Sequence, residues 1–186
     1  MSWETLYGWC DDIVEPYRRA VAEAPPGSIL VEVGVFLGRS ACALSHFARA
    51  AGKGLRVYAV DPWGPDISGW GPDGPMLSGG HPFTSALRGM LEQAPDDLEQ
   101  LTLLRLPSVQ ASRVFDDRSV QFAFIDACHE YEAVQADIAA WRTKVCPGGV
   151  LAGHDYRPTA PGVVRAVDEA FRGRVEVSGS VWQVRP

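Results

Sequence analysis

Two short stretches of the chain combine carboxylates with imidazoles, a combination that can support acid–base or metal chemistry. In the stretch FAFIDACHEY, residues 122–131, an apolar run stops at Asp126, and His129 follows three residues later. A second apolar run, VLAGHD, stops at His154 and Asp155. An imidazole titrates near neutral pH and can accept a proton, whereas carboxylates can share a divalent cation. For each residue taken alone, a turn or a helix cap is the simpler explanation.

Alternating strand-like and helix-like segments would position these residues. Apolar runs predict five strands, at residues 28–34, 55–61, 101–106, 120–126 and 150–155. Helical spacing predicts helices at residues 39–52, 84–94, 108–115, 130–145 and 162–171. Two short strands, RVEVSG and SVWQV, close the chain. This alternation predicts an α/β fold with right-handed βαβ units, in which helices cover both faces of a mostly parallel, seven-stranded sheet.

The same spacing predicts which side chains face the core. In the segment 130–145, apolar residues recur at helical intervals, and the polar residues between them, Asp137 included, are expected to face solvent. Residues 1–27 are expected to contribute one or two accessory helices. Their apolar stripe would include Trp9 and Tyr17.

A stretch rich in Gly and Pro, residues 62–82, interrupts the alternation. It is too long for a plain connection between elements. Trp63 and Trp70 argue against a disordered insertion, because disordered segments contain few large apolar residues. We expect a loop or lid over a site, with a surface insertion as the alternative.

Composition excludes several function classes. The 186 residues suffice for one domain over residues 1–186. A net charge of −6 without a Lys/Arg cluster offers no attraction to nucleic acid or to an anionic membrane. The N-terminus shows no signal peptide and no membrane span, and the four cysteines contain no CxxC pair. We therefore expect a cytoplasmic protein that acts on a small molecule. Its oligomeric state stays open, with a homo-oligomer among the options.

The turn after the first predicted strand, EVGVFLGRS, is of a kind that ligands of parallel sheets contact. Its G-x-x-x-G spacing, from Gly34 to Gly38, differs from the G-x-G-x-x-G of dinucleotide-binding proteins. Glu32 would repel a pyrophosphate but would suit a ligand with an amino group and a sulfonium. Asp61 ends the second strand, where it could accept hydrogen bonds from ribose. A glycine turn and a strand-end carboxylate that bind nothing are the alternative.

Four segments carry a resemblance to a known family: VEVGVFLGRSA, VYAVD, FAFIDACHEYEAVQADIAAW and CPGGVLAGHDY. From about residue 28 onward, the chain resembles class I S-adenosylmethionine-dependent methyltransferases. The most similar branch includes macrocin-type sugar O-methyltransferases and cephalosporin-hydroxylase-like proteins. The resemblance implies a Rossmann-like fold. It also implies that the cofactor would contact Glu32, Gly34, Val35, Gly38, Ser40, Asp61, Pro107, Ser108 and Asp126.

Asp126 and Asp155 would lie side by side, because one crossover helix joins the neighbouring parallel strands that they end. Two carboxylates so close repel each other unless a proton or a cation lies between them. Oxygen ligands favour Mg²⁺, and His154 as a third ligand would be tolerated better by Mn²⁺. By resemblance to metal-dependent O-methyltransferases, Asp126 is also a catalytic residue and His129 is the base; a helix-start cap is the alternative for His129.

The sequence therefore favours an S-adenosylmethionine-dependent O-methyltransferase that a divalent metal assists. Its acceptor would be a hydroxylated small molecule, such as a sugar, a glycoside or a polyphenol-like natural product. Two alternatives stay open. One is an enzyme of the cephalosporin-hydroxylase-like branch with another activity, and the other is a cofactor-binding module without catalysis.

Overall fold

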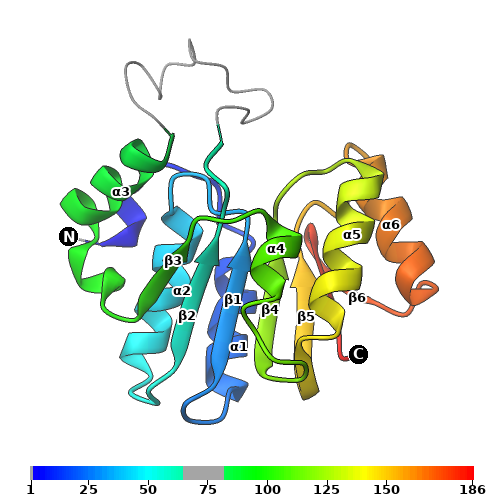
Figure 1. Cartoon of the computed structure of the whole chain (residues 1–186), viewed down its shortest axis with the longest axis horizontal. Coiled ribbons are helices and arrows are strands. Elements are labelled where there is room, and N and C mark those ends of the chain that lie inside the picture. The colour runs from blue at the N-terminus through cyan, green and yellow to red at the C-terminus, as the bar shows by residue number, and fades with distance from the viewer. Residues whose placement is uncertain (1, 65–81) are drawn as a thin grey trace.

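The computed structural model describes residues 2–64 and 82–186, and a seven-stranded sheet lies at its centre (Figure 1). The strands are β1 (Ile29–Val33), β2 (Arg56–Val60), β3 (Leu101–Leu104), β4 (Val120–Ile125), β5 (Val145–Gly153), β6 (Glu176–Ser178) and β7 (Val181–Val184). Their order is β3-β2-β1-β4-β5-β7-β6. The first five are parallel, and β7 pairs antiparallel with β5 and β6. The predicted mostly parallel sheet is confirmed.

Helices cover both faces of the sheet (Figure 1). One side carries α1 (Val14–Glu23), α2 (Arg39–Ala50), α3 (Pro82–Gln93) and the short 3₁₀ helices η1 (Trp3–Thr5) and η2 (Pro95–Leu98). The other side carries α4 (Ser108–Ser112), α5 (Tyr131–Arg142) and α6 (Pro161–Phe171). Along β4, Phe122 and Phe124 join the core with α1 and α2, whereas Ala123 and Ile125 join the core with α5 and α6. This alternation is why the strand is apolar throughout.

The strand order reverses between β1 and β4, and the chain turns sharply there. From β1 the chain proceeds to β2 and β3 on one side, and it returns to β4 on the other. Gly34 follows β1 with φ 89°, and a Cβ at this position would lie 1.9 Å from the carbonyl oxygen of Asp126. Only glycine therefore allows this turn and the end of β4 to approach so closely. Ligands of open parallel sheets bind at such a reversal.

Strand β5 begins earlier than the sequence indicated. The CPGG segment was expected to end a helix and precede a strand at residue 150, but α5 ends at Arg142 and β5 starts at Val145. The pairing of β4 with β5 shifts register between Val120 and Phe122. This irregularity accommodates Pro147, which cannot donate a backbone hydrogen bond to a regular ladder.

The N-terminal segment and the start of the long loop also differ from expectation. Tyr17 is buried as predicted, but Trp9 lies in irregular chain between η1 and α1 with 60% of its surface exposed. Trp63 is buried, and its Nε1–H donates to the carbonyl oxygen of Phe36. It is therefore a fixed part of the core. Residues 65–81, Trp70 included, lie outside the described residues, so the lid stays a prediction.

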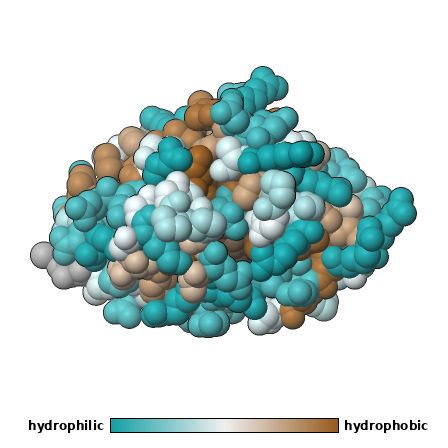
Figure 2. Space-filling model, turned by 90° about the horizontal axis from the view of Figure 1, so that it is seen from below, coloured by the Kyte–Doolittle hydropathy of each residue, from teal (hydrophilic) through white to brown (hydrophobic). Residues whose placement is uncertain are grey.

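The edge of the sheet seen from below carries mostly hydrophilic residues, with smaller hydrophobic areas between them (Figure 2). Within the described part of the chain, no helix combines the length and the apolar character needed to cross a membrane. The residues with predicted chemistry gather at the opposite edge, where the parallel strands end.

Candidate active site

Two cavities open where the parallel strands end. The larger, of about 590 Å³, contains acidic and basic side chains, and we call it the polar cavity. The other, of about 470 Å³, has mainly aliphatic walls from the strand ends and α5, and we call it the apolar cavity. Both are lined by Gly34, Val35, Phe36, Asp126, Ala127 and Cys128. One ligand could therefore extend from one cavity into the other past Asp126.

Asp61 lines the apolar cavity and fastens the turn after β1. Its Oδ2 accepts hydrogen bonds from the backbone N–H groups of Val35 (2.9 Å) and Phe36 (3.1 Å). Its Oδ1 accepts the N–H of Trp63 at 2.6 Å. A carboxylate has about four acceptor positions. Asp61 therefore shapes the turn and keeps little capacity for ribose, the role that the resemblance implied.

Glu32 lies beneath the turn and lines neither cavity. It is fully buried, Ser40 Oγ donates to its Oε1, and burial raises the pKa of the carboxyl to about 8. The buried hydroxyl of Tyr17 also interacts with this carboxyl. Ser40 lines the polar cavity, so any influence of Glu32 on a ligand passes through Ser40 or requires a small rearrangement.

Gly38 caps the start of α2 with φ 94°, and a Cβ at this position would lie 2.5 Å from Met90 Sδ. The left-handed backbone conformation favours glycine here, and any side chain would also have to displace Met90. Pro107 and Ser108 line the apolar cavity at the start of α4. Asp137 lines it as well, although the sequence indicated a solvent-facing residue. Only 5% of Asp137 is exposed, and burial raises the pKa of its carboxyl, because α4 covers this face of α5.

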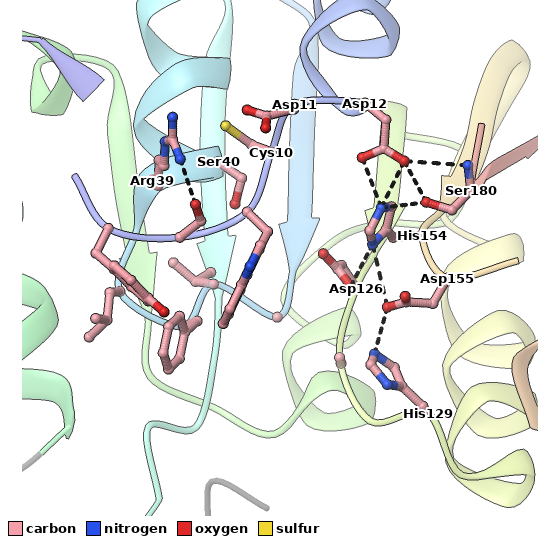
Figure 3. Close-up of a pocket in the computed structure, with 18 of the residues that line it drawn as sticks. Cys10, Asp11, Asp12, Arg39, Ser40, Asp126, His129, His154, Asp155 and Ser180 are labelled. Carbon is pink, nitrogen blue, oxygen red and sulfur yellow. Dashed lines mark hydrogen bonds and ion pairs between the residues drawn. The ribbon is translucent and has the colours of Figure 1, made fainter. Parts of the chain in front are cut away.

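The polar cavity brings together the four residues with which the sequence analysis began (Figure 3). Pairing of β4 with β5 aligns Ile125 with Gly153 and so aligns the residues that follow. Potential ligand atoms of Asp126, His154 and Asp155 lie within 4.8 Å of one another. His129 Nε2 lies 2.9 Å from Asp155 Oδ2.

Charge is balanced within this cluster. Burial alone would lower the pKa of His154, but contacts with Asp126 and Asp155 raise it to about 10. Burial alone would raise the pKa of Asp155, but contacts with His129 and His154 hold it well below its usual range. The contact with Asp155 raises the pKa of His129. The imidazolium of His154 and the guanidinium of Arg157, 2.5 Å from Asp155 Oδ1, thus supply positive charge beside the two carboxylates.

The sequence analysis missed three residues of this cluster: Arg157, which pairs with Asp155, and Asp12 and Ser180, which contact His154. His154 Nε2 lies 3.1 and 3.2 Å from the carboxylate oxygens of Asp12 and 2.8 Å from Ser180 Oγ (Figure 3). Ser180 Oγ also donates a very short hydrogen bond to Asp12. Asp12 precedes α1 and Ser180 lies in the turn between β6 and β7, so no local pattern connects them.

Aromatic residues form another wall of the polar cavity. The rings of Trp9 and Phe36 stack at 6.0 Å, and Tyr7 meets Trp9 edge to face at 5.5 Å. Tyr7 is 45% exposed. Arg39 holds this N-terminal segment by donating to the carbonyl oxygen of Gly8 at 2.6 Å. We call Tyr7, Trp9 and Phe36 the aromatic wall.

Residues 31–156 match a protein family described as "Methyltransferase domain". The chain belongs to this methyltransferase family. The matched region contains the turn after β1 and the ends of β4 and β5, and the sheet order is that of the class I S-adenosylmethionine-dependent methyltransferases, as the resemblance implied. A search among curated proteins found no match.

Solved structures with the same fold include several methyltransferases. The O-methyltransferase NovP has 20% identity and a TM-score of 0.64, with 94% of this chain and 79% of NovP covered. CalS11, a TDP-rhamnose 3'-O-methyltransferase of calicheamicin biosynthesis, has 16% identity and a TM-score of 0.62, with 93% and 76% covered. SMU.1697c of Streptococcus mutans, in complex with SAH, has 12% identity and a TM-score of 0.61, with 96% and 97% covered. At these identities the likeness concerns the fold.

Proposed function

We propose that this methyltransferase transfers a methyl group from S-adenosylmethionine to a hydroxyl group of a small molecule. The observation that carries the proposal is the junction of the two cavities at Asp126, with His129 and Asp155 beside it. NovP and CalS11 are named as O-methyltransferases, which supports a hydroxyl acceptor for a protein of the same fold.

The apolar cavity suits the adenosine part of the cofactor, with Asp61, Pro107 and Ser108 along it. The turn at Gly34 and Val35 would then face the methionine part, near Ser40, whereas Gly38 lines neither cavity and would act by shaping the turn. Ser40, whose hydroxyl donates to the buried Glu32, links this carboxyl to a cationic amino group in the polar cavity. When bound, S-adenosylmethionine supplies the electrophilic methyl group. The residues of this half bind and orient it.

His129 is the base of the proposed reaction. Its Nε2 faces Asp155, so Nδ1 is left to accept the acceptor's proton. Asp155 orients the ring and stabilises the imidazolium that forms, as a carboxylate beside a catalytic histidine does. The side chain of His129 is 51% exposed, so an acceptor in the polar cavity can reach it.

Asp126, Asp155 and His154 form the proposed site for a divalent metal, Mg²⁺ or Mn²⁺. They offer two oxygen donors and one nitrogen donor within 4.8 Å, which fits one ion with open positions. A bound metal would acidify the hydroxyl of an acceptor. Asp126 lies on the boundary of both cavities, so it would orient the acceptor oxygen toward the cofactor.

The aromatic wall supports a ring-shaped acceptor. Exposed aromatic rings bind the flat apolar face of a ring, while the acids and imidazoles across the cavity bind its hydroxyl groups. A sugar, a glycoside or a polyphenol-like natural product combines these two features. We therefore expect neighbouring hydroxyl groups on the acceptor.

Formation of S-adenosylhomocysteine tests this function. The purified protein is mixed with S-adenosylmethionine and a panel of glycosides and polyphenols, with Mg²⁺, with Mn²⁺ or with a chelator. We expect turnover with a vicinal diol, loss of turnover in chelator and recovery with added metal. Cofactor binding without turnover on any acceptor would favour the non-catalytic module. A chemical change in an acceptor without formation of S-adenosylhomocysteine would favour another activity, as in the cephalosporin-hydroxylase-like alternative.

A further inference from the structure

The two ring nitrogens of His154 have different surroundings. Nδ1 faces the proposed metal site, 3.4 Å from Asp155 Oδ2 and 3.7 Å from Asp126 Oδ1. Nε2 faces the opposite way, toward Asp12 and Ser180. Only 11% of the His154 side chain is exposed, so the ring is held between two groups of partners.

The hydrogen bonds around Ser180 assign the proton on Nε2. The hydroxyl of Ser180 donates its single proton to Asp12, and the backbone N–H of Ser180 donates to the same carboxylate at 3.3 Å. Ser180 Oγ can therefore act only as an acceptor toward His154 Nε2, 2.8 Å away. Asp12 is an acceptor as well. Both contacts require a proton on Nε2, so Nδ1 is the nitrogen that can coordinate a metal, and the metal must displace the proton that Nδ1 carries in the imidazolium.

This arrangement is the one that metal-binding histidines use. A histidine that coordinates a metal through one nitrogen usually donates its other N–H to a carboxylate, which fixes the tautomer and the orientation of the ring. We infer that Asp12 and Ser180 are positioning residues that present Nδ1 of His154 as a metal ligand, so that the site binds Mn²⁺ in preference to Mg²⁺. The inference rests on the metal site of the proposed function.

Mn²⁺ preference follows from the donor set. Mg²⁺ prefers oxygen ligands and a regular octahedron, whereas Mn²⁺ accepts an imidazole nitrogen more readily. Without Asp12 the ring could rotate or change tautomer, and the two carboxylates alone would remain. The selectivity for Mn²⁺ should then decrease together with the affinity.

Pulsed electron paramagnetic resonance of bound Mn²⁺ tests the inference without any turnover. Wild-type protein should show coupling between Mn²⁺ and one histidine nitrogen, and His154→Ala should lose it. Asp12→Ala and Ser180→Ala should weaken this coupling. Asp12→Ala should reduce Mn²⁺ affinity roughly 10–100-fold, the usual effect of removing such a partner, and Mg²⁺ affinity by a smaller factor.

Asp11→Ala is the matched control, because Asp11 carries the same charge, adjoins Asp12 in sequence and lines the same cavity. It should preserve both the nitrogen coupling and the preference for Mn²⁺. S-adenosylhomocysteine binding and thermal unfolding verify the fold of each variant. Because Asp12→Ala also frees the N-terminal segment, Ser180→Ala provides a second, smaller change at the same nitrogen.

Each contrary outcome has its own meaning. Mn²⁺ binding without nitrogen coupling in the wild type would overturn the role of His154 but leave the metal site in place. Wild-type protein that binds S-adenosylhomocysteine but neither metal would overturn this inference and the metal, though not methyl transfer. Unchanged coupling and selectivity in both Asp12→Ala and Ser180→Ala would show that these residues only hold the N-terminal segment in place and do not position His154.

Discussion

The two cavities that meet at Asp126 are built from different parts of the chain. The apolar cavity uses strand ends and the starts of α4 and α5, all within the region that matches the methyltransferase family. The polar cavity adds residues 7–12 and Ser180, which lie outside that region. The strand order therefore dictates the half proposed for the cofactor, whereas the half proposed for the acceptor also depends on segments outside the matched region.

The cavities also differ in how they would hold a ligand. In the apolar cavity, Asp61 accepts hydrogen bonds from three backbone N–H groups, so its main role is to fix the shape of the cavity wall. In the polar cavity, acids and bases face one another across short distances. Variants in the first half should thus alter cofactor affinity, and variants in the second should alter turnover.

His129→Ala should give the largest effect, because it should reduce turnover without changing cofactor affinity. Loss of a general base typically reduces turnover by about 10²–10⁴-fold. S-adenosylhomocysteine affinity, measured by calorimetry, should not change. His46→Gln is a matched control, because His46 pairs with Asp97 far from either cavity. Equal loss of turnover in both variants would indicate general damage and contradict the role of His129.

The pH dependence of turnover sharpens the same test. The contact with Asp155 raises the pKa of His129 above its ordinary value of 6.5. A base must be neutral to act, so turnover should rise with pH through this raised pKa and then level off. His129→Ala should lack that inflection. If it keeps the inflection, another group in the site accepts the proton.

Much of the fold could be predicted because apolar periodicity reports local structure. The adjacency of Asp126 and Asp155 could be predicted as well, because a single crossover helix makes β4 and β5 neighbours. Asp137 was assigned wrongly to solvent, since a helical pattern does not reveal that α4 packs over α5. Trp9 was assigned wrongly to an apolar stripe, because the chain from residue 6 to residue 13 departs from a regular helix.

The remainder of the site depends on contacts that no local pattern encodes. Asp12 and Ser180 are separated by 168 residues and meet only after the β6–β7 turn folds beside the N-terminal segment. An isolated Asp before a helix reads as a cap, and a Ser in a turn reads as a turn residue. The polar cavity is thus the part of the site that the sequence alone could not predict.

Asp61→Ala should affect the apolar cavity, which is proposed to bind the cofactor. The substitution removes three hydrogen bonds to backbone N–H groups, and S-adenosylhomocysteine affinity should fall by roughly 1–3 kcal/mol. Calorimetry with and without metal measures this loss. Mn²⁺ affinity should stay within about twofold of wild type, since sites without shared partners are usually independent. A parallel loss of metal binding would show that the turn couples the two cavities.

Glu32→Gln should give the smallest effect, and it concerns a proton. Burial raises the pKa of Glu32 to about 8, so near neutral pH the carboxyl is largely protonated in the free protein. A cationic amino group bound nearby favours the charged carboxylate and lowers that pKa. Binding of S-adenosylhomocysteine should therefore release part of a proton between the lowered pKa and about 8.

Calorimetry in two buffers with different ionisation enthalpies measures this release, and Glu32→Gln should abolish it with little change in affinity. Stability supplies an independent check on the sign. Because the folded state holds this proton more tightly than the unfolded state, Glu32 should make the free protein less stable as pH rises from about 4.5 to about 8. Glu32→Gln should flatten this slope. If Glu32→Gln flattens the pH dependence of stability yet leaves the proton release unchanged, the carboxyl is buried as described, but another group releases the proton when the cofactor binds. Glu32 would then have no role in cofactor binding.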